Sequence, residues 1–198
     1  MPAQDRRTQL LDIALNVFSQ KGFNGATTKE IAGAAGVTEA VIFRHFPTKQ
    51  ALYQEVLESE IGCPRFQEWL VKAKDCMDRN DDEGLFQAIA TAILESHRGD
   101  ARLQRVLLFA ALEGSEIALT HHRNFSIPIY ELLRDYIVRR QRDGALAEYH
   151  PGAILSAIAG MAARYAVYTQ FFGFAAEASD EETIAAFTNI LMNGIKAR

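Results

Sequence analysis

The sequence predicts an all-α protein, and two observations carry this prediction. Nearly every segment repeats apolar residues at the three- and four-residue spacing of a helix, and no segment alternates polar and apolar residues for long enough to indicate a strand. Glycine and proline mostly fall between the periodic segments, where they end one helix and open the next. We expect about nine to ten helices, with a three-helix head at the N-terminus and a larger helical body after it.

The first helix is expected to end at Gly22. Its apolar stripe repeats every three or four residues and consists of Leu10, Ile13, Ala14, Val17 and Phe18. A glycine directly after the last turn can adopt the left-handed conformation that closes many helices.

The next two helices are short and are joined at a glycine. Thr27 and Glu30 have the spacing of a capping box, which predicts a second helix that begins after Thr27 and ends at Gly36. Thr38 can cap the third helix. The pair is therefore a helix-turn-helix, the arrangement that many proteins use to place one helix in the DNA major groove.

The remaining helices form the body. Pro47 and Thr48 end the third helix and open a fourth, from about Lys49 to Ile61, which the Gly62-Cys63-Pro64 step breaks. Further helices are expected over residues 65–79, 82–97, 100–113, 116–142, 151–173 and 180–196. Pro128 should kink or split the 116–142 segment, because proline removes a helical hydrogen bond.

Charge is distributed unevenly between the head and the body. Residues 1–50 hold six Lys or Arg and four Asp or Glu, a net charge of +2, whereas the rest hold 15 and 21, a net charge of −6. The overall charge of −4 argues against a protein that coats nucleic acid along its length. A mildly basic head on an acidic body fits a local DNA-binding module.

The outer side of the third helix is suited to DNA. Val37, Ile42 and Phe46 should pack inward, which leaves an outer set made of Thr38, Glu39, Ala40, Phe43, Arg44 and His45. Small residues allow close approach to the groove, and an arginine can bond a guanine edge or a phosphate. The helix starts at Thr27-Thr28 and at Thr48-Lys49 offer free N–H groups to phosphates. Taken singly, each of these residues is better explained as an ordinary helix cap, a core position or a solvated side chain.

The joint pattern is more specific. Thr27-Thr28-x-x-Ile31-Ala32-x-x-Ala35-Gly36-Val37-Thr38, followed by Phe43, His45, Phe46, Pro47 and Lys49, closely resembles the DNA-binding head of the TetR family of transcriptional repressors over about residues 8–57. The resemblance implies a helix-turn-helix DNA-binding domain over residues 1–48 and a helical ligand-binding and dimerisation domain over residues 49–198. It also implies DNA contacts from Thr28, Thr38, Phe43, His45 and Lys49, with Glu39, Ala40 and Arg44 on the face that reads bases.

The chain departs from the family pattern at two places. The family usually has tyrosine at the position of Phe43, where the hydroxyl can reach a phosphate. Residues Ala40-Val41-Ile42 are also more apolar than is usual there, so the base preference of the family cannot be transferred to this chain.

The segment from Gly152 to Phe174 is apolar on all sides and must therefore be covered on all sides. It is either the central helix of the body, or one of its faces meets a second chain. TetR-like proteins dimerise through their last two long helices, and two half-sites one helical turn apart require two heads. The resemblance therefore favours a homodimer, with an interface that includes Ala153, Ala157, Gly160, Arg164, Phe187 and Leu191.

The resemblance also implies a pocket for a small apolar or amphipathic effector among the aromatic-rich middle helices. Candidate lining residues are Trp69, Phe109, Glu113 and Tyr165, although core aromatics and surface charges would give the same pattern. An effector would lower operator affinity by changing the spacing of the two heads.

Other classes of protein find less support. The chain has no phosphate-binding glycine loop, no Gly-x-Ser-x-Gly, no His-Glu-x-x-His and no metal-type Cys/His spacing, so we expect no enzyme activity, cofactor or metal. The alternative is an all-α enzyme or small-molecule binding protein with an incidental helix-turn-helix. The polar N-terminus and the short apolar runs predict a cytoplasmic protein without a membrane span.

Overall fold

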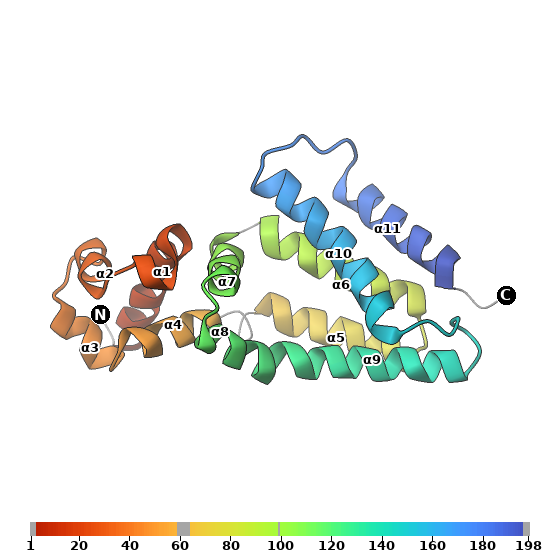
Figure 1. Ribbon diagram of the computed structural model, residues 1–198, viewed down its shortest axis with the longest axis horizontal. Helices are drawn as coiled ribbons and strands as arrows, with labels where there is room; N and C mark the ends of the chain where they lie inside the picture. Colours follow the sequence, from red (N-terminus) through yellow and green to blue (C-terminus); the bar gives the residue numbers. More distant parts are fainter. Residues whose placement is uncertain (1–2, 59–63, 99, 196–198) are drawn as a thin grey trace. The chain divides into compact units, whose positions relative to one another are not determined.

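The computed structural model describes residues 3–58, 64–98 and 100–195, and the regular elements of this part of the chain are helices without a strand (Figure 1). The all-α prediction is therefore confirmed. The helices form two compact units. Unit 1 comprises residues 1–63 and 101–126, and unit 2 comprises residues 64–100 and 127–198.

Unit 1 combines the three N-terminal helices with three later ones. It contains α1 (Ala3–Gly25), α2 (Thr28–Ala34), α3 (Glu39–His45), α4 (Lys49–Glu58), α7 (Arg102–Leu112), α8 (Glu116–His121) and the π-helical turn η1 (His122–Ser126). Helix α1 lies at the centre and packs against α2, α4 and α7. Gly22 interrupts the helical geometry of α1 with φ 69° and ψ −177°, which confirms the predicted helix end.

The apolar stripe of α1 is the core of this unit. Leu10, Ala14 and Phe18 are fully buried, and they pack with Ile31 of α2 and Ile42 of α3. The cluster continues through Phe46, Leu52, Tyr53, Val56, Leu57, Leu103, Val106 and Ala110. Because the inner sides of α2 and α3 are buried in this core, the orientation of the helix-turn-helix is fixed from within and its outer side remains free.

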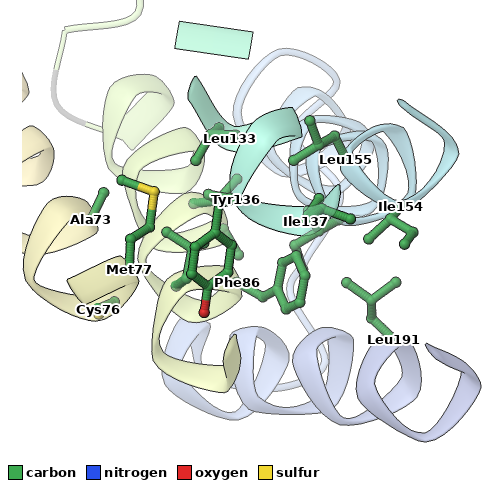
Figure 2. Packing of buried hydrophobic residues seen from close by; sticks show 14 of the residues in the cluster. Ala73, Cys76, Met77, Phe86, Leu133, Tyr136, Ile137, Ile154, Leu155 and Leu191 are labelled. Atoms are coloured by element: carbon green, nitrogen blue, oxygen red, sulfur yellow. The ribbon is translucent and has the colours of Figure 1, made fainter. Parts of the chain in front are cut away.

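Unit 2 is a bundle around α6. It contains α5 (Pro64–Asp78), α6 (Asp82–Arg98), α9 (Ile127–Arg142), α10 (Pro151–Gln170) and α11 (Asp180–Ile195), and α6 packs against α5, α10 and α11. Figure 2 shows Phe86 of α6, Ile137 of α9, Leu155 of α10 and Leu191 of α11 converging on a shared interior. This bundle has its own hydrophobic core, separate from that of unit 1.

The segment expected over residues 116–142 is split, as predicted. Helix α8 passes into η1, and α9 begins at Ile127, immediately before Pro128. Proline cannot donate the backbone hydrogen bond that would continue a helix through this point. The split also separates the two compact units. The expected end of the fourth helix at Ile61 and the break at Gly62-Cys63 lie outside the described residues.

The compact units do not coincide with the functional domains expected at 1–48 and 49–198. Helices α4, α7 and α8 belong to the same unit as the N-terminal three helices. The boundary at residue 48 concerns which residues bind DNA and which bind an effector, so it stays a prediction.

Candidate DNA-binding surface

The start of α2 is closed by the predicted capping box. The Thr27 hydroxyl accepts a hydrogen bond from the Glu30 N–H at 3.2 Å, and the Glu30 carboxylate accepts one from the Thr27 N–H at 3.0 Å. Lys21 forms a 2.5 Å ion pair with the same carboxylate. The Lys21 contact, followed by the bonds from Thr27, lowers the pKa of Glu30 to about 2. The entry to α2 is thereby tied to the end of α1.

Two of the predicted DNA-contact residues bind each other. The Thr28 hydroxyl donates a hydrogen bond to the Glu39 carboxylate, which links the first turn of α2 to the first turn of α3. Glu39 is half-buried, so its charge lies at the junction of the two helices. A phosphate that approaches Thr28 meets a carboxylate already in place, and the two negative charges repel.

The outer side of α3 is exposed in the expected places. Ala40, Phe43 and Arg44 are exposed, Phe43 to 44%, and their spacing puts them on one face of the helix. His45 is half-buried, with its ring 6.3 Å from that of Phe46. Thr38 stands at the N-cap with extended backbone, but its side chain makes no capping hydrogen bond. The exposed face therefore combines a small residue, an aromatic ring and a guanidinium group.

The start of α4 presents a hydroxyl and a cation. Thr48 accepts a hydrogen bond from the Ala51 N–H at 3.0 Å and so caps α4 as predicted. The Lys49 ammonium lies 4.3 Å from the centre of the Phe23 ring, a cation–π distance. Partial burial lowers the pKa of Lys49, while the charges of Glu113 and Glu30 oppose this shift. Lys49 is therefore held against the end of α1 rather than extended freely into solvent.

Glu113 and Arg7 have no predicted part in DNA binding, yet both support the head through contacts with distant residues. Glu113, at the C-terminal end of α7, accepts hydrogen bonds from the backbone N–H groups of Phe23 and Asn24, each at 3.2 Å. Arg7 forms a 2.5 Å ion pair with Glu55, and its guanidinium lies 4.5 Å from the centre of the Phe46 ring. These contacts join residues that are tens of positions apart, so no local sequence pattern predicts them.

The four predicted pocket residues are divided between the units. Phe109 and Glu113 belong to unit 1, whereas Trp69 and Tyr165 pack against the core of unit 2. The Trp69 indole N–H is buried and has no hydrogen-bond partner among the described residues. Tyr165 donates a 3.5 Å hydrogen bond to the Ala178 carbonyl.

A separate cavity of about 260 Å³ lies within unit 1. Its lining mixes two carboxylates with amide, hydroxyl and apolar groups, and none of the four predicted pocket residues belongs to it. The lining residues are Gln54, Glu58, Glu116, Ile117, Thr120, Asn124 and Phe125.

The predicted interface residues do not all face the same way. Ala153, Ala157, Gly160 and Arg164 are exposed along one side of α10, and a Cβ added at Gly160 would meet nothing within 4 Å. Phe187 is half-buried, with its ring edge-on to Tyr165 at 6.0 Å. Leu191 is only 7% exposed and belongs to the core of its own chain, and its place in the interface stays a prediction. The large exposed apolar side chain on this helix is Ile190, at 64%.

Within residues 3–58, 64–98 and 100–195, no three His, Cys, Asp or Glu residues gather as metal ligands would. In the same part of the chain, no helix has the length and apolar character needed to cross a membrane. Cys76 is a buried free thiol, whereas Cys63 lies outside the described residues.

Comparison with known proteins agrees with this arrangement. Residues 10–56 match the family model of the tetR family of bacterial regulatory proteins. The transcriptional regulator AcrR of Shigella flexneri is 46% identical over 63 residues, which are 30% of this chain and 29% of AcrR. The regulator TtgR of Pseudomonas putida is 29% identical over 154 residues, 78% of this chain and 65% of TtgR. The chain thus spans less than two thirds of the length of each of these relatives.

Likeness in structure extends over the whole chain. The crystal structure of NalD from Pseudomonas aeruginosa aligns with a TM-score of 0.72 and 19% sequence identity, covering 99% of this chain and 98% of NalD. At that identity the likeness concerns the fold, and it includes both the head and the helices that follow it. Residues 10–56 therefore belong to the DNA-binding head of the tetR family of bacterial regulatory proteins, and the fold of the whole chain matches that of NalD.

Proposed function

We propose that this protein is a DNA-binding transcriptional regulator that acts in the cytoplasm as a homodimer. It represses transcription from a near-palindromic operator and releases the operator when a small effector binds. The observation that carries the proposal is the outer face of α3, where Ala40, Phe43 and Arg44 are exposed between two capped helix starts. An exposed helix of this kind, flanked by anion-attracting helix ends, suits a major groove bordered by two phosphate backbones.

In this proposal the head divides its contacts between phosphates and bases. Thr27, Thr28, Thr48 and Lys49 hold the backbone and fix the register of the protein on the duplex. Bases are read from α3, by the residues Thr38, Glu39, Ala40, Phe43, Arg44 and His45. The hydrogen bond between Thr28 and Glu39 has to break before Thr28 can donate to a phosphate. The released Glu39 carboxylate could then accept a hydrogen bond from a cytosine amine.

The proposed dimer interface lies on the outer sides of α10 and α11. Ala153, Ala157 and Gly160 give α10 a face of small residues on which a second helix can approach closely, and Arg164 lies on the same face. On α11 the interface expected from the sequence includes Phe187 and Leu191, and the large exposed apolar side chain of Ile190 joins them in this proposal. A second chain would cover this apolar surface, which is the usual reason for a protein to carry one.

Repression and effector binding complete the proposal. The solved relative NalD is described as a secondary repressor of a multidrug efflux pump, which favours repression as the sign of regulation. The effector would be small and apolar or amphipathic, and the buried, unpartnered Trp69 N–H offers it a donor. An effector shifts operator affinity only if it binds one arrangement of the two heads better than the other.

The proposal is tested by selecting DNA fragments with the purified protein and measuring affinity for the selected fragment against salt concentration. A regulator that neutralises several phosphates should lose affinity with a log–log slope of about −0.9 per phosphate. Lys49→Ala should weaken binding to all sequences and reduce the slope by about one unit, whereas Arg44→Ala should relax sequence preference. A flat salt response, or no selection over random DNA, would exclude this function in favour of an all-α enzyme or ligand carrier.

A further inference from the structure

Glu113 occupies a position that α7 itself does not favour. It is the C-cap residue of α7, and Gly114, with φ 61°, ends the helix directly behind it. The C-terminal end of a helix carries partial negative charge, so a carboxylate there is destabilising unless something else binds it. In this molecule the compensating contacts come from the backbone of a segment 90 residues away.

The contacts of Glu113 are directed at Phe23 and Asn24, which form the last turn of α1 after its break at Gly22. One carboxylate oxygen accepts from the Phe23 N–H and the other from the Asn24 N–H, both at 3.2 Å. A carboxylate that accepts two backbone N–H bonds holds the turn more firmly than a neutral side chain would, because charge-assisted hydrogen bonds are stronger.

Gly22 is what allows the carboxylate to reach these N–H groups. A Cβ at this position would lie 2.4 Å from a carboxylate oxygen of Glu113 and 3.2 Å from the Phe109 ring. Gly22 also has φ 69°, which side-chain-bearing residues rarely adopt. The absence of a side chain at the end of α1 therefore leaves the space that the Glu113 carboxylate at the end of α7 occupies.

The turn held by Glu113 supports two parts of the candidate DNA surface. The Phe23 ring lies beneath the Lys49 ammonium and packs against Tyr53 of α4, with ring centres 4.9 Å apart. Four residues after Phe23, Thr27 caps α2. A shift of the turn would therefore move the ring that holds Lys49 and the segment that leads to the start of α2.

We propose that Glu113 is a positioning residue for DNA binding, which holds the Phe23–Asn24 turn so that Lys49 and the start of α2 keep the spacing required by the phosphate backbone. Glu113 itself touches no DNA in this account and acts through the turn. The inference rests on the proposed DNA-binding function, and it places in the head a residue that the sequence had suggested for an effector pocket.

The test compares four full-length variants with the unmodified protein on the DNA fragment that the unmodified protein selects. Glu113→Ala removes both acceptors, and Glu113→Gln keeps one acceptor while removing the charge. Glu116→Ala and Glu116→Gln are the matched controls, because Glu116 is an exposed glutamate in the same unit and loses the same charge.

An effect of charge alone and an effect of positioning predict opposite changes in the DNA affinity of the Glu113 variants. Loss of a negative charge weakens repulsion of DNA, so on charge alone all four variants should bind slightly more tightly. Positioning predicts that Glu113→Ala binds about tenfold more weakly, the scale of one lost charge-assisted hydrogen bond. Glu113→Gln should fall between Glu113→Ala and the unmodified protein, and the Glu116 variants should not weaken.

Two further measurements separate positioning from loss of structure. Hydrogen exchange at the Phe23 and Asn24 amides should accelerate in Glu113→Ala at a temperature where circular dichroism shows an intact fold. The effects of Glu113→Ala and Lys49→Ala on DNA affinity should be less than additive, because both act on the same contact.

Several outcomes would overturn the inference. The first is that the Glu113 variants bind DNA as tightly as the Glu116 variants, and the second is that their loss of DNA affinity only follows the fraction of unfolded protein. The third is that the effects of Glu113→Ala and Lys49→Ala on DNA affinity are fully additive. If Glu113→Ala does not fold, Glu113→Gln and the exchange rates decide the question. Failure of the unmodified protein to bind any fragment is a different result, since it removes the proposed function itself.

Discussion

At the scale of residues, the acids of the head are held by partners. Glu30 binds Lys21 and caps α2, Glu39 binds Thr28, and Glu113 binds the backbone of the last turn of α1. Each carboxylate is thereby kept in a defined place near the candidate DNA-binding surface. The capping role of Glu30 was predictable because it depends on a spacing of three residues, whereas the bond of Glu113 spans 90 positions and was not.

The lowered pKa of Glu30 gives a prediction on acid stability. The folded-state pKa of about 2 lies below the ordinary value of 4.5, so the ionised carboxylate stabilises the folded state above pH about 4.5. That contribution should be lost progressively as the pH falls towards 2. Denaturant unfolding of Glu30→Gln should therefore show reduced stability at pH 7 and a difference from the unmodified protein that shrinks as the pH falls through this window.

Glu55→Gln is a control for this measurement, since Glu55 also forms an ion pair in the head but has no part in a helix cap. A difference between Glu30→Gln and the unmodified protein that stays constant from pH 7 to pH 2 would contradict the role given to the Glu30 charge.

At the scale of elements, the helix starts were more predictable than the packing between helices. Helix α2 begins where Thr27 and Glu30 place it, and α11 begins behind Ser179, which forms the same reciprocal box with Glu182. The second box is also visible in the sequence as Ser-x-x-Glu. Capping chemistry is local, so a few residues are enough to determine it.

Contacts between elements depend on distant partners, and one largely buried polar network joins α6 to α9. Asp82, the first residue of α6, accepts hydrogen bonds from Arg140 at 2.8 and 3.0 Å and from the Tyr136 hydroxyl at 2.5 Å. The Asp82 and Arg140 side chains are only 10% and 14% exposed. Burial, followed by the bond to Asp82, raises the pKa of Tyr136.

Loss of this network should destabilise unit 2. Asp82→Ala leaves the largely buried Arg140 with only its longer contact to Asp143, at 3.3 Å, so we expect unfolding to become easier by about 3 kcal/mol. Chemical denaturation followed by circular dichroism measures this change. Asp135→Ala is the control, because the Arg134–Asp135 pair is exposed to solvent and its loss should have little effect. Equal stability of the two variants would show that the network contributes little.

At the scale of the whole molecule, the proposed dimer can be tested through Ile190. A lysine at this position would put an unpaired charge into the interface between two chains, which is costly. Ile190→Lys should therefore raise the dimer dissociation constant by about 30-fold or more, the scale of an interface hot spot. Sedimentation velocity over a range of concentrations measures the shift towards monomer, and DNA affinity should fall with it.

Val71→Lys is the matched control, since Val71 is 70% exposed on α5 of the same unit and lies outside the proposed interface. If Ile190→Lys and Val71→Lys associate as the unmodified protein does, the α10–α11 surface is not the interface.

By itself the sequence determined the helical class, the position of most helices, the split near Pro128 and the membership of the head in the TetR family. These properties follow from periodicity, caps and turns, which act over a few residues. Only the tertiary structure decided that α7 and α8 join the N-terminal unit, that Leu191 is buried within its own chain and that Glu113 holds the end of α1. Those outcomes depend on which distant segments pack together and exclude water from their shared interface. The sequence of one such segment does not indicate which other segment it will pack against.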